Sequence, residues 1–171
     1  MQKVSSFLDG INKYVGNFFA WSTALLVVTI MIDVIMRYLF SRSFIWITEL
    51  ETYFFAISFM LAGGYAYAND KHVRVDLFYS KWSVRKKATV DLLGTVFFLL
   101  PWCIISIIVC YKYFYASFKI GESSAQAGGL GGVYILKFIV LLGFILLLLQ
   151  AVSVILTSVT TLFSSHSSKV N

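Results

Sequence analysis

Four long apolar runs, separated by shorter polar stretches, dominate the pattern of residues along the chain. The runs cover residues 16–39, 48–68, 88–113 and 133–156. Each is long enough to cross about 30 Å of hydrocarbon as a helix of about 20 residues, and none shows the alternation of a membrane β-strand. The pattern predicts an all-α membrane protein in which residues 1–171 form a single four-helix membrane domain.

The residues ahead of the first run predict an amphipathic helix. Apolar residues recur there at helical spacing and form one stripe, consisting of Val4, Phe7, Leu8, Ile11, Val15 and Phe18. Asp9 and Lys13 lie off the stripe at the i,i+4 spacing of an ion pair. We expect an interfacial helix leading into the first span. A signal peptide is disfavoured, because the run that follows is too long and no small-x-small cleavage site is evident.

Composition and charge agree with a membrane protein and predict its orientation. The 171 residues are 59% hydrophobic and 13% charged, with a mean hydropathy of +0.83, whereas soluble domains carry about 25% charged residues. Nine of the 14 Lys and Arg residues fall in the two tails and in the loop between the second and third runs. The positive-inside rule therefore places both termini in the cytoplasm. In this setting the net charge of +6 is an orientation signal, and no nucleic-acid partner is expected.

The start of the second run carries acidic residues whose carboxylates need interaction partners. Thr48 and Glu51 have the spacing of a capping box at a helix start. That motif does not explain Glu49, which needs a cation, a lipid headgroup or water as its partner, and Trp46 is placed to seal that partner from lipid. A purely structural role of Glu49 and a contact with another subunit both stay open.

Small residues in the second run predict close helix packing. Ser58, Ala62 and Ala66 are spaced by four, and Gly63 and Gly64 adjoin them. Small side chains at this spacing let helix backbones approach in lipid. The partner helix belongs either to this chain or to another.

Three further features of the runs have structural interpretations. Asp33 and Arg37 are spaced for an ion pair inside the first span, with a proton-coupling carboxylate or a subunit contact as the alternatives. Pro101 should kink the third span. Cys103 and Cys110 lie two helical turns apart, about 10 Å, which is beyond disulfide reach, so we expect free thiols.

No enzyme, cofactor or metal site is predicted. The two histidines, His72 and His166, lie outside the runs, which excludes a bis-histidine haem bundle. The sequence contains no G-x-S-x-G, P-loop or zinc spacing, and no pair of broken apolar segments of the kind that forms a transporter's midplane site.

The order of motifs resembles a known family. An amphipathic N-terminus precedes a first span ending M-R-Y-L-F, followed by W-I-T-E-L-E, a second span with F-M-L-A-G-G-Y-A-Y-A, and K-H-V-R-V-D-L-F before a basic run. The chain resembles the small membrane (Q-type, DctQ-like) subunit of tripartite ATP-independent periplasmic (TRAP) transporters, most specifically between Arg37 and Phe78. The family's tryptophan and acid look like Trp46 and Glu49, and its glycine looks like Gly63 or Gly64. Its loop element looks like His72, Val73, Val75 and Asp76.

The resemblance implies a subunit of the bacterial inner membrane. Such a subunit scaffolds a large (M-type) sodium-coupled permease, which takes up an organic acid such as sialic acid or a C4-dicarboxylate from a periplasmic binding protein. A small proton-coupled exporter using Asp33, or a membrane anchor of an enzyme complex, stays open as an alternative.

Three groups of residues are candidate interaction sites. The first, at an interface with a subunit or lipid, consists of Trp46, Glu49, Ser58, Ala62, Gly63 and Ala66. The second, in a loop against the cytoplasmic phospholipid leaflet, consists of His72, Arg74, Asp76, Arg85, Lys86 and Lys87. The third, for docking of the binding protein through rim charges, consists of Arg42, Lys119 and Glu122.

Overall fold

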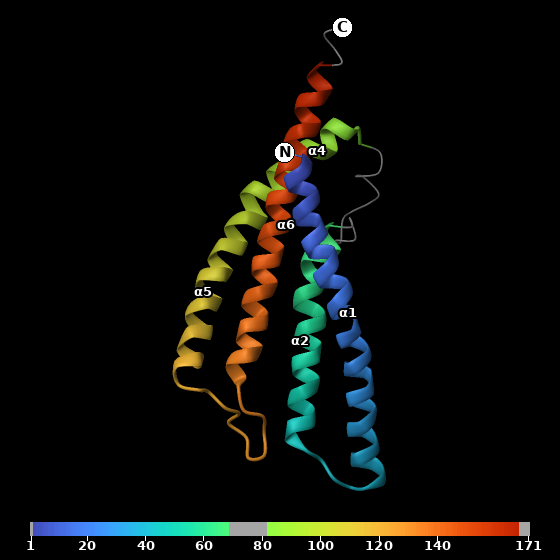
Figure 1. Cartoon of the computed structure of the whole chain (residues 1–171), viewed down its shortest axis with the longest axis vertical. Coiled ribbons are helices and arrows are strands. Elements are labelled where there is room, and N and C mark those ends of the chain that lie inside the picture. Colours follow the sequence, from blue (N-terminus) through green and yellow to red (C-terminus); the bar gives the residue numbers. More distant parts are fainter. Residues whose placement is uncertain (1, 69–81, 168–171) are drawn as a thin grey trace.

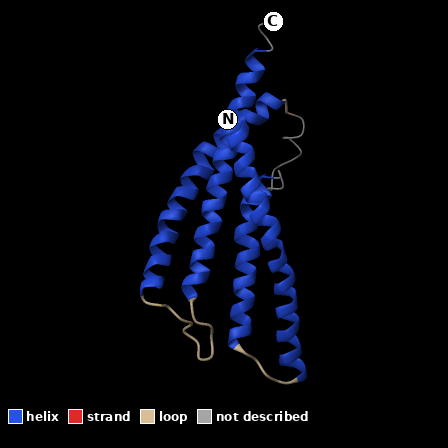
Figure 2. Ribbon diagram, viewed as in Figure 1, coloured by secondary structure: helices blue, strands red, loops and turns tan. Residues whose placement is uncertain are grey.

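Helices account for nearly all of the computed structural model, which describes residues 2–68 and 82–167. The elements are α1 (Gln2–Leu39), α2 (Ile45–Ala68), α4 (Val84–Gly94), a π-helical turn η1 (Thr95–Leu99), α5 (Leu100–Lys119) and α6 (Val133–Ser167). Within the described residues Figure 2 shows helices joined by loops and no strand. The prediction of an all-α protein is confirmed.

Among the described residues, three helical stretches are long and apolar enough to cross a membrane. They are Lys3–Leu39, Val84–Lys119 and Val133–Phe163. The remaining helix, α2, has 24 residues and is about 36 Å long at 1.5 Å per residue, so its length suits a crossing. That α2 is a fourth span stays a prediction.

Successive long helices run in opposite directions, with α6 in the middle. Figure 1 shows α5, α6, α2 and α1 side by side in the view down the shortest axis. α6 contacts α1, α2, α4 and α5, whereas the extensive contacts of α5 within the described residues are confined to α6 and η1. The start of α1 and the end of α6 lie at one end, which we call the termini end, and the loops 40–44 and 120–132 lie at the other, the loop end (Figure 1).

The helices extend beyond the four predicted spans, whose bounds stay predictions. The N-terminal segment is the first part of the continuous helix α1, and α6 extends to Ser167 rather than ending near residue 156. α2 begins at Ile45, because the Phe44 carbonyl already accepts a bond of 3.1 Å from the Ile47 N–H. Thr48 therefore lies within the first turn, and the predicted capping box does not form.

The predicted kink at Pro101 takes the form of a π-helical turn just before it. Proline has no N–H and crowds the carbonyl four residues earlier, which here belongs to Phe97. The turn η1 widens the helix at this point, so that the N–H of Leu100 bonds the carbonyl of Thr95, five residues back. The side chain of Thr95 is buried and lies 2.8 Å from the Tyr67 hydroxyl of α2, which ties the turn to the rest of the fold.

α2 and α6 approach each other closely at Gly143. A Cβ atom added at Gly143 would lie 2.9 Å from both the Cβ and the carbonyl oxygen of Met60. At Gly63, by contrast, an added Cβ would meet nothing within 4 Å. Ser58 faces α1, where its hydroxyl lies 2.7 Å from that of Ser22. The small residues of α2 are therefore only partly used inside the chain, and the glycine that allows close packing, Gly143, was not predicted.

Candidate functional site

The carboxylate of Glu49 is held by the loop between α5 and α6. Its Oε2 accepts a bond of 2.5 Å from the backbone N–H of Leu130, and its Oε1 accepts a bond from the Ser124 hydroxyl. A Cβ at Gly129 would lie 2.8 Å from Oε1 and closer to the Ser124 side chain, so glycine is required there. We call these four residues the Glu49 clasp. The predicted cation, headgroup or water is replaced by a hydroxyl and an amide of the same chain.

Further bonds hold the same loop against α2. The Tyr53 hydroxyl donates to the Gly132 carbonyl at 3.4 Å, and the Ser124 N–H donates to the Leu130 carbonyl at 3.0 Å. Gly132 has φ +82°, a left-handed conformation that glycine adopts without strain. Beside the clasp lies a cavity of about 240 Å³, lined by Ser43, Ile45, Thr48, Glu49, Thr52 and Gln126. The loop end is thus a defined surface with a polar cavity.

Glu122, a predicted docking residue, is paired within the chain. Its Oε2 lies 2.5 Å from the Nζ of Lys137, which in turn lies 3.7 Å from the centre of the Tyr113 ring. The hydrogen bond donated by Lys137 lowers the pKa of Glu122 from its ordinary value. The Glu122 carbonyl also accepts a bond of 3.0 Å from the Val133 N–H, so this residue anchors the loop to α6.

The other two predicted docking residues are exposed at the loop end. Arg42 lies in the loop after α1, where its N–H bonds the Met36 carbonyl at 3.0 Å. Lys119 is the last residue of α5, and its Nζ lies 4.9 Å from the centre of the Tyr115 ring. The structure places both at the same end as Glu122, and their role in docking stays a prediction.

The remaining interface candidates on α2 have different surroundings. Trp46 is 45% exposed, and its ring centre lies 6.3 Å from that of Phe44. Ser58 bonds α1, and Ala66 is half-buried. The side chain of Ala62 lies outside the described residues. No single surface uses all of these residues within the chain.

A row of polar side chains joins α1 to α6 near the termini end. Asp9 Oδ1 accepts bonds from Gln150 Nε2 at 2.8 Å and from the Ser153 hydroxyl at 2.7 Å, and Gln150 Oε1 accepts from Asn12 Nδ2 at 2.9 Å. The Ser5 and Ser153 hydroxyls lie 2.7 Å apart. We call this row the polar ladder; it consists of Ser5, Asp9, Asn12, Gln150, Ser153 and Thr157. The predicted Asp9–Lys13 pair is wrong, because Asp9 bonds α6 instead.

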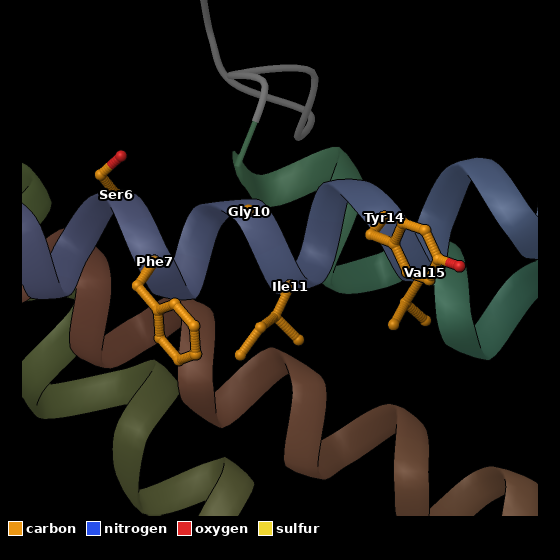
Figure 3. Close-up of a pocket in the computed structure, with 6 residues that line it drawn as sticks. All are labelled: Ser6, Phe7, Gly10, Ile11, Tyr14 and Val15. Atoms are coloured by element: carbon orange, nitrogen blue, oxygen red, sulfur yellow. The ribbon is translucent and has the colours of Figure 1, made fainter.

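The polar ladder buries polar side chains of the N-terminal segment against α6, while the apolar Phe7 of the same segment stays 68% exposed. Figure 3 shows a groove on this part of α1, lined by Ser6, Phe7, Gly10, Ile11, Tyr14 and Val15. Phe7, Ile11 and Val15 project to the side on which α6 runs, and Ser6 projects away from it (Figure 3). The groove has a volume of about 400 Å³, and its apolar lining suits a hydrocarbon chain or an apolar side chain.

Asp33 and Arg37 form the ion pair that their spacing predicts. Asp33 Oδ2 bonds Arg37 Nη2, and the Asp33 side chain is 7% exposed against 52% for Arg37. The predicted ion pair is confirmed, and the role of Asp33 beyond it stays a prediction.

Part of the predicted cytoplasmic loop is visible at the start of α4. Ser83 caps the helix by accepting a bond of 3.4 Å from the Lys86 N–H, and Lys86 Nζ lies 4.7 Å from the Trp82 ring centre. Arg85 and Lys86 are exposed, and Lys87 is half-buried. His72, Arg74 and Asp76 lie outside the described residues.

The cysteines are free thiols, and the acidic residues form no metal-binding group in the described part of the chain. Cys103 is buried, Cys110 is half-buried, and both are free thiols, as predicted. Within residues 2–68 and 82–167, no group of three or more His, Cys, Asp and Glu side chains could hold a metal ion.

These features define an all-helical membrane protein whose polar side chains bind one another across helix interfaces. The family model of tripartite ATP-independent periplasmic transporters, DctQ component, matches residues 26–161. The chain therefore belongs to this family and is the small membrane subunit of a TRAP transporter. The family is a component of a transporter rather than an enzyme. A comparison with curated proteins found no match.

The structure shows the Glu49 clasp and the polar ladder, neither of which was predicted from the sequence. The signal for the ladder is present, because Gln150, Ser153 and Thr157 fall on one face of an otherwise apolar helix. The partner of Glu49 carries no such signal, since Ser124 and Leu130 lie 75 and 81 residues away along the chain.

Proposed function

We propose that this subunit scaffolds the large sodium-coupled permease subunit in the inner membrane of a bacterium. The permease would take up an organic acid, such as sialic acid or a C4-dicarboxylate, delivered by a periplasmic binding protein. The observation that carries the proposal is the contrast between polar groups bonded inside the chain and apolar side chains exposed on its outer helices. Trp21 of α1 is 73% exposed, and Trp102 of α5 is 63% exposed.

The proposed topology has four spans and both termini in the cytoplasm. It is supported by the excess of Lys and Arg in the tails and in the loop between α2 and α4, and by the position of both termini at one end (Figure 1). A cysteine introduced at Lys86 should react with a membrane-impermeant maleimide only from the cytoplasm, and one at Lys119 only from the periplasm. Labelling from the opposite sides would overturn the topology. Cys103 and Cys110 should stay unlabelled in both variants, because they lie within α5.

The alternative of a proton-coupled exporter has less support. Asp33 is engaged with Arg37, and neither the groove on α1 nor the cavity beside the clasp is lined by Asp33. An anchor for an enzyme complex is disfavoured by the family. We therefore expect that the subunit reconstituted alone gives no sodium-driven uptake, whereas the assembled transporter does.

Co-purification with the large subunit tests the scaffold. A Cβ added at Gly63 would meet no atom of the described residues within 4 Å, so we expect this chain to accommodate a leucine there while the leucine blocks a helix of the partner. Gly94 also has nothing within 4 Å and provides the matched control. We expect the wild type and Gly94→Leu to retain the large subunit and Gly63→Leu to lose most of it. Equal retention of the large subunit by both variants would show that Gly63 does not lie at the interface. No retention of the large subunit by the wild type would contradict the scaffold role itself.

Docking of the binding protein is the part of the proposal that concerns the loop end. Rim charges mainly change association rates and their salt dependence. Arg42→Glu combined with Lys119→Glu should therefore slow uptake when the binding protein is scarce, with little effect when it is abundant. Lys13→Glu, at the termini end, is the control. Superimposable uptake curves for all variants at low and high salt would assign docking to the large subunit alone.

A further inference from the structure

A second acidic residue of α2, Glu51, lies on the helix face that meets α1. Ser22 of α1 and Ser58 of α2 are bonded across this interface, and the two helices run antiparallel (Figure 1). Asp33 lies 11 residues after Ser22, close to three helical turns, and Glu51 lies seven residues before Ser58, close to two turns. Both carboxyl groups thus lie on the contacting faces, about one turn apart along the helix axes.

Each of these carboxyl groups has a buried oxygen without a hydrogen-bond partner. The Asp33 side chain is only 7% exposed. Its Oδ2 bonds Arg37, whereas its Oδ1 is buried and has no hydrogen-bond partner. Glu51 Oε1 is also buried without a partner. A buried polar atom without a partner costs about 1–3 kcal/mol, and more when the group is charged. The two unpartnered carboxyl oxygens therefore indicate that a hydrogen-bond donor is needed between α1 and α2.

The charges around this position do not balance. The register that brings Asp33 and Glu51 to the same interface also brings Arg37, which lies one turn beyond Asp33 and is bonded to it. On α2 itself Glu49 is held in the clasp, and on α6, which also packs against α2, Lys137 is paired with Glu122. Two carboxylates thus share one guanidinium, which is itself half exposed. An uncompensated charge in such surroundings is costly, and like charges that share a site cannot both ionise readily.

We propose that Asp33, Arg37 and Glu51 form a proton-binding site between α1 and α2, in which Glu51 carries the proton at neutral pH and Asp33 stays paired with Arg37. The group is then electrically neutral, and the acid O–H of Glu51 supplies a donor at the interface where the vacant oxygens lie. Deprotonation leaves one net negative charge between the two helices. The site goes beyond the proposed function and does not depend on it.

Infrared spectroscopy of the full chain in lipid nanodiscs tests the assignment. A protonated carboxyl group absorbs above the amide I band, and the band shifts in D₂O. We expect the wild type minus Glu51→Gln difference spectrum at pH 7 to contain the band of one protonated carboxyl group per chain. Glu122→Gln is the matched control and should leave the band unchanged, because Glu122 is ionised beside Lys137. Circular dichroism checks that each variant is folded.

Asp33→Asn provides a second test that does not depend on the folding of Glu51→Gln. Without Asp33, Glu51 becomes the only acid beside Arg37, and the protonated band at pH 7 should disappear. A wild-type spectrum without the band, or a band that persists in Asp33→Asn, would overturn the shared site. Replacing choline chloride by sodium chloride at constant pH should leave the wild-type band unchanged; its loss would show that the site takes Na⁺ instead of a proton.

Discussion

The contact between Gly143 and Met60 makes a sharp prediction about the packing of α2 on α6. An alanine at Gly143 would place its Cβ 2.9 Å from two atoms of Met60, one of them a backbone oxygen. Favourable contacts between carbon atoms lie at about 3.5–4.0 Å, so the two helices would have to separate by roughly 0.6–1 Å. Extra volume in a packed interface costs about 1–3 kcal/mol.

Gly63→Ala isolates this cost from the general effect of adding a methyl group to a helix. Both glycines lie in helix interiors, and replacing either by alanine gains up to about 1 kcal/mol of helix propensity. Only Gly143 meets a neighbour, because an added Cβ at Gly63 contacts nothing within 4 Å. The free energy of unfolding of Gly143→Ala should therefore fall about 1–3 kcal/mol below that of Gly63→Ala.

Titration of the purified chain with sodium dodecyl sulfate in mixed micelles, followed by circular dichroism, measures this difference. The comparison uses the chain without its large subunit, so that the proposed role of Gly63 at a subunit interface does not enter. Equal unfolding free energies for the two variants, within about 0.5 kcal/mol, would refute the close approach of α2 and α6.

Three further predictions concern the polar contacts. A double-mutant cycle of Asn12→Leu and Gln150→Leu should give a coupling energy of about 0.6–1.7 kcal/mol in unfolding; additivity of the single variants would contradict the ladder. Glu49→Gln should speed amide hydrogen exchange in the loop between α5 and α6, and unchanged exchange would show that the clasp does not hold that loop. Lys137→Met should raise the pKa of Glu122 toward its ordinary value, because the hydrogen bond donated by Lys137 is lost. NMR of ¹³C-labelled glutamate measures this pKa. Since the pKa of Glu122 is lowered on folding, this pair stabilises the wild type at neutral pH, and its contribution should fade as the pH drops through that lowered pKa.

The helices were predictable because lipid imposes a simple rule on them. Every backbone group must be bonded internally, and about 20 apolar residues are needed to cross, so hydropathy alone locates the runs. The helix ends were not predictable in this way. The apolar stripe from Val4 to Phe18 predicts the first part of α1, whereas the extension of α6 was not predicted; the ladder joins the two helices at the termini end through residues such as Ser5 and Ser153, which are 148 positions apart.

The interaction sites were harder to predict, because a local pattern does not say which neighbour it meets. The small residues around Gly63 predict close packing, and the structure uses Gly143 for that purpose inside the chain. Glu49 was correctly singled out as a carboxylate that needs a partner, but the partner lies in a loop far along the sequence. Residue types thus indicate that a contact is required, and tertiary structure decides with whom.

The acidic and basic residues of the chain are used in opposite ways. Four acids hold the fold together: Asp9 joins α1 to α6, Glu49 fastens the loop end, and Asp33 and Glu122 each bind a cation of the same chain. Many of the bases face outward instead, and the exposed ones include Lys3, Lys13, Arg42, Arg85, Lys86, Lys112 and Lys119. Because the sides of the molecule are apolar, a protein partner within the membrane must recognise it by shape and small residues. Because both ends carry exposed cations, we expect anionic headgroups at one end and an acidic protein surface at the other.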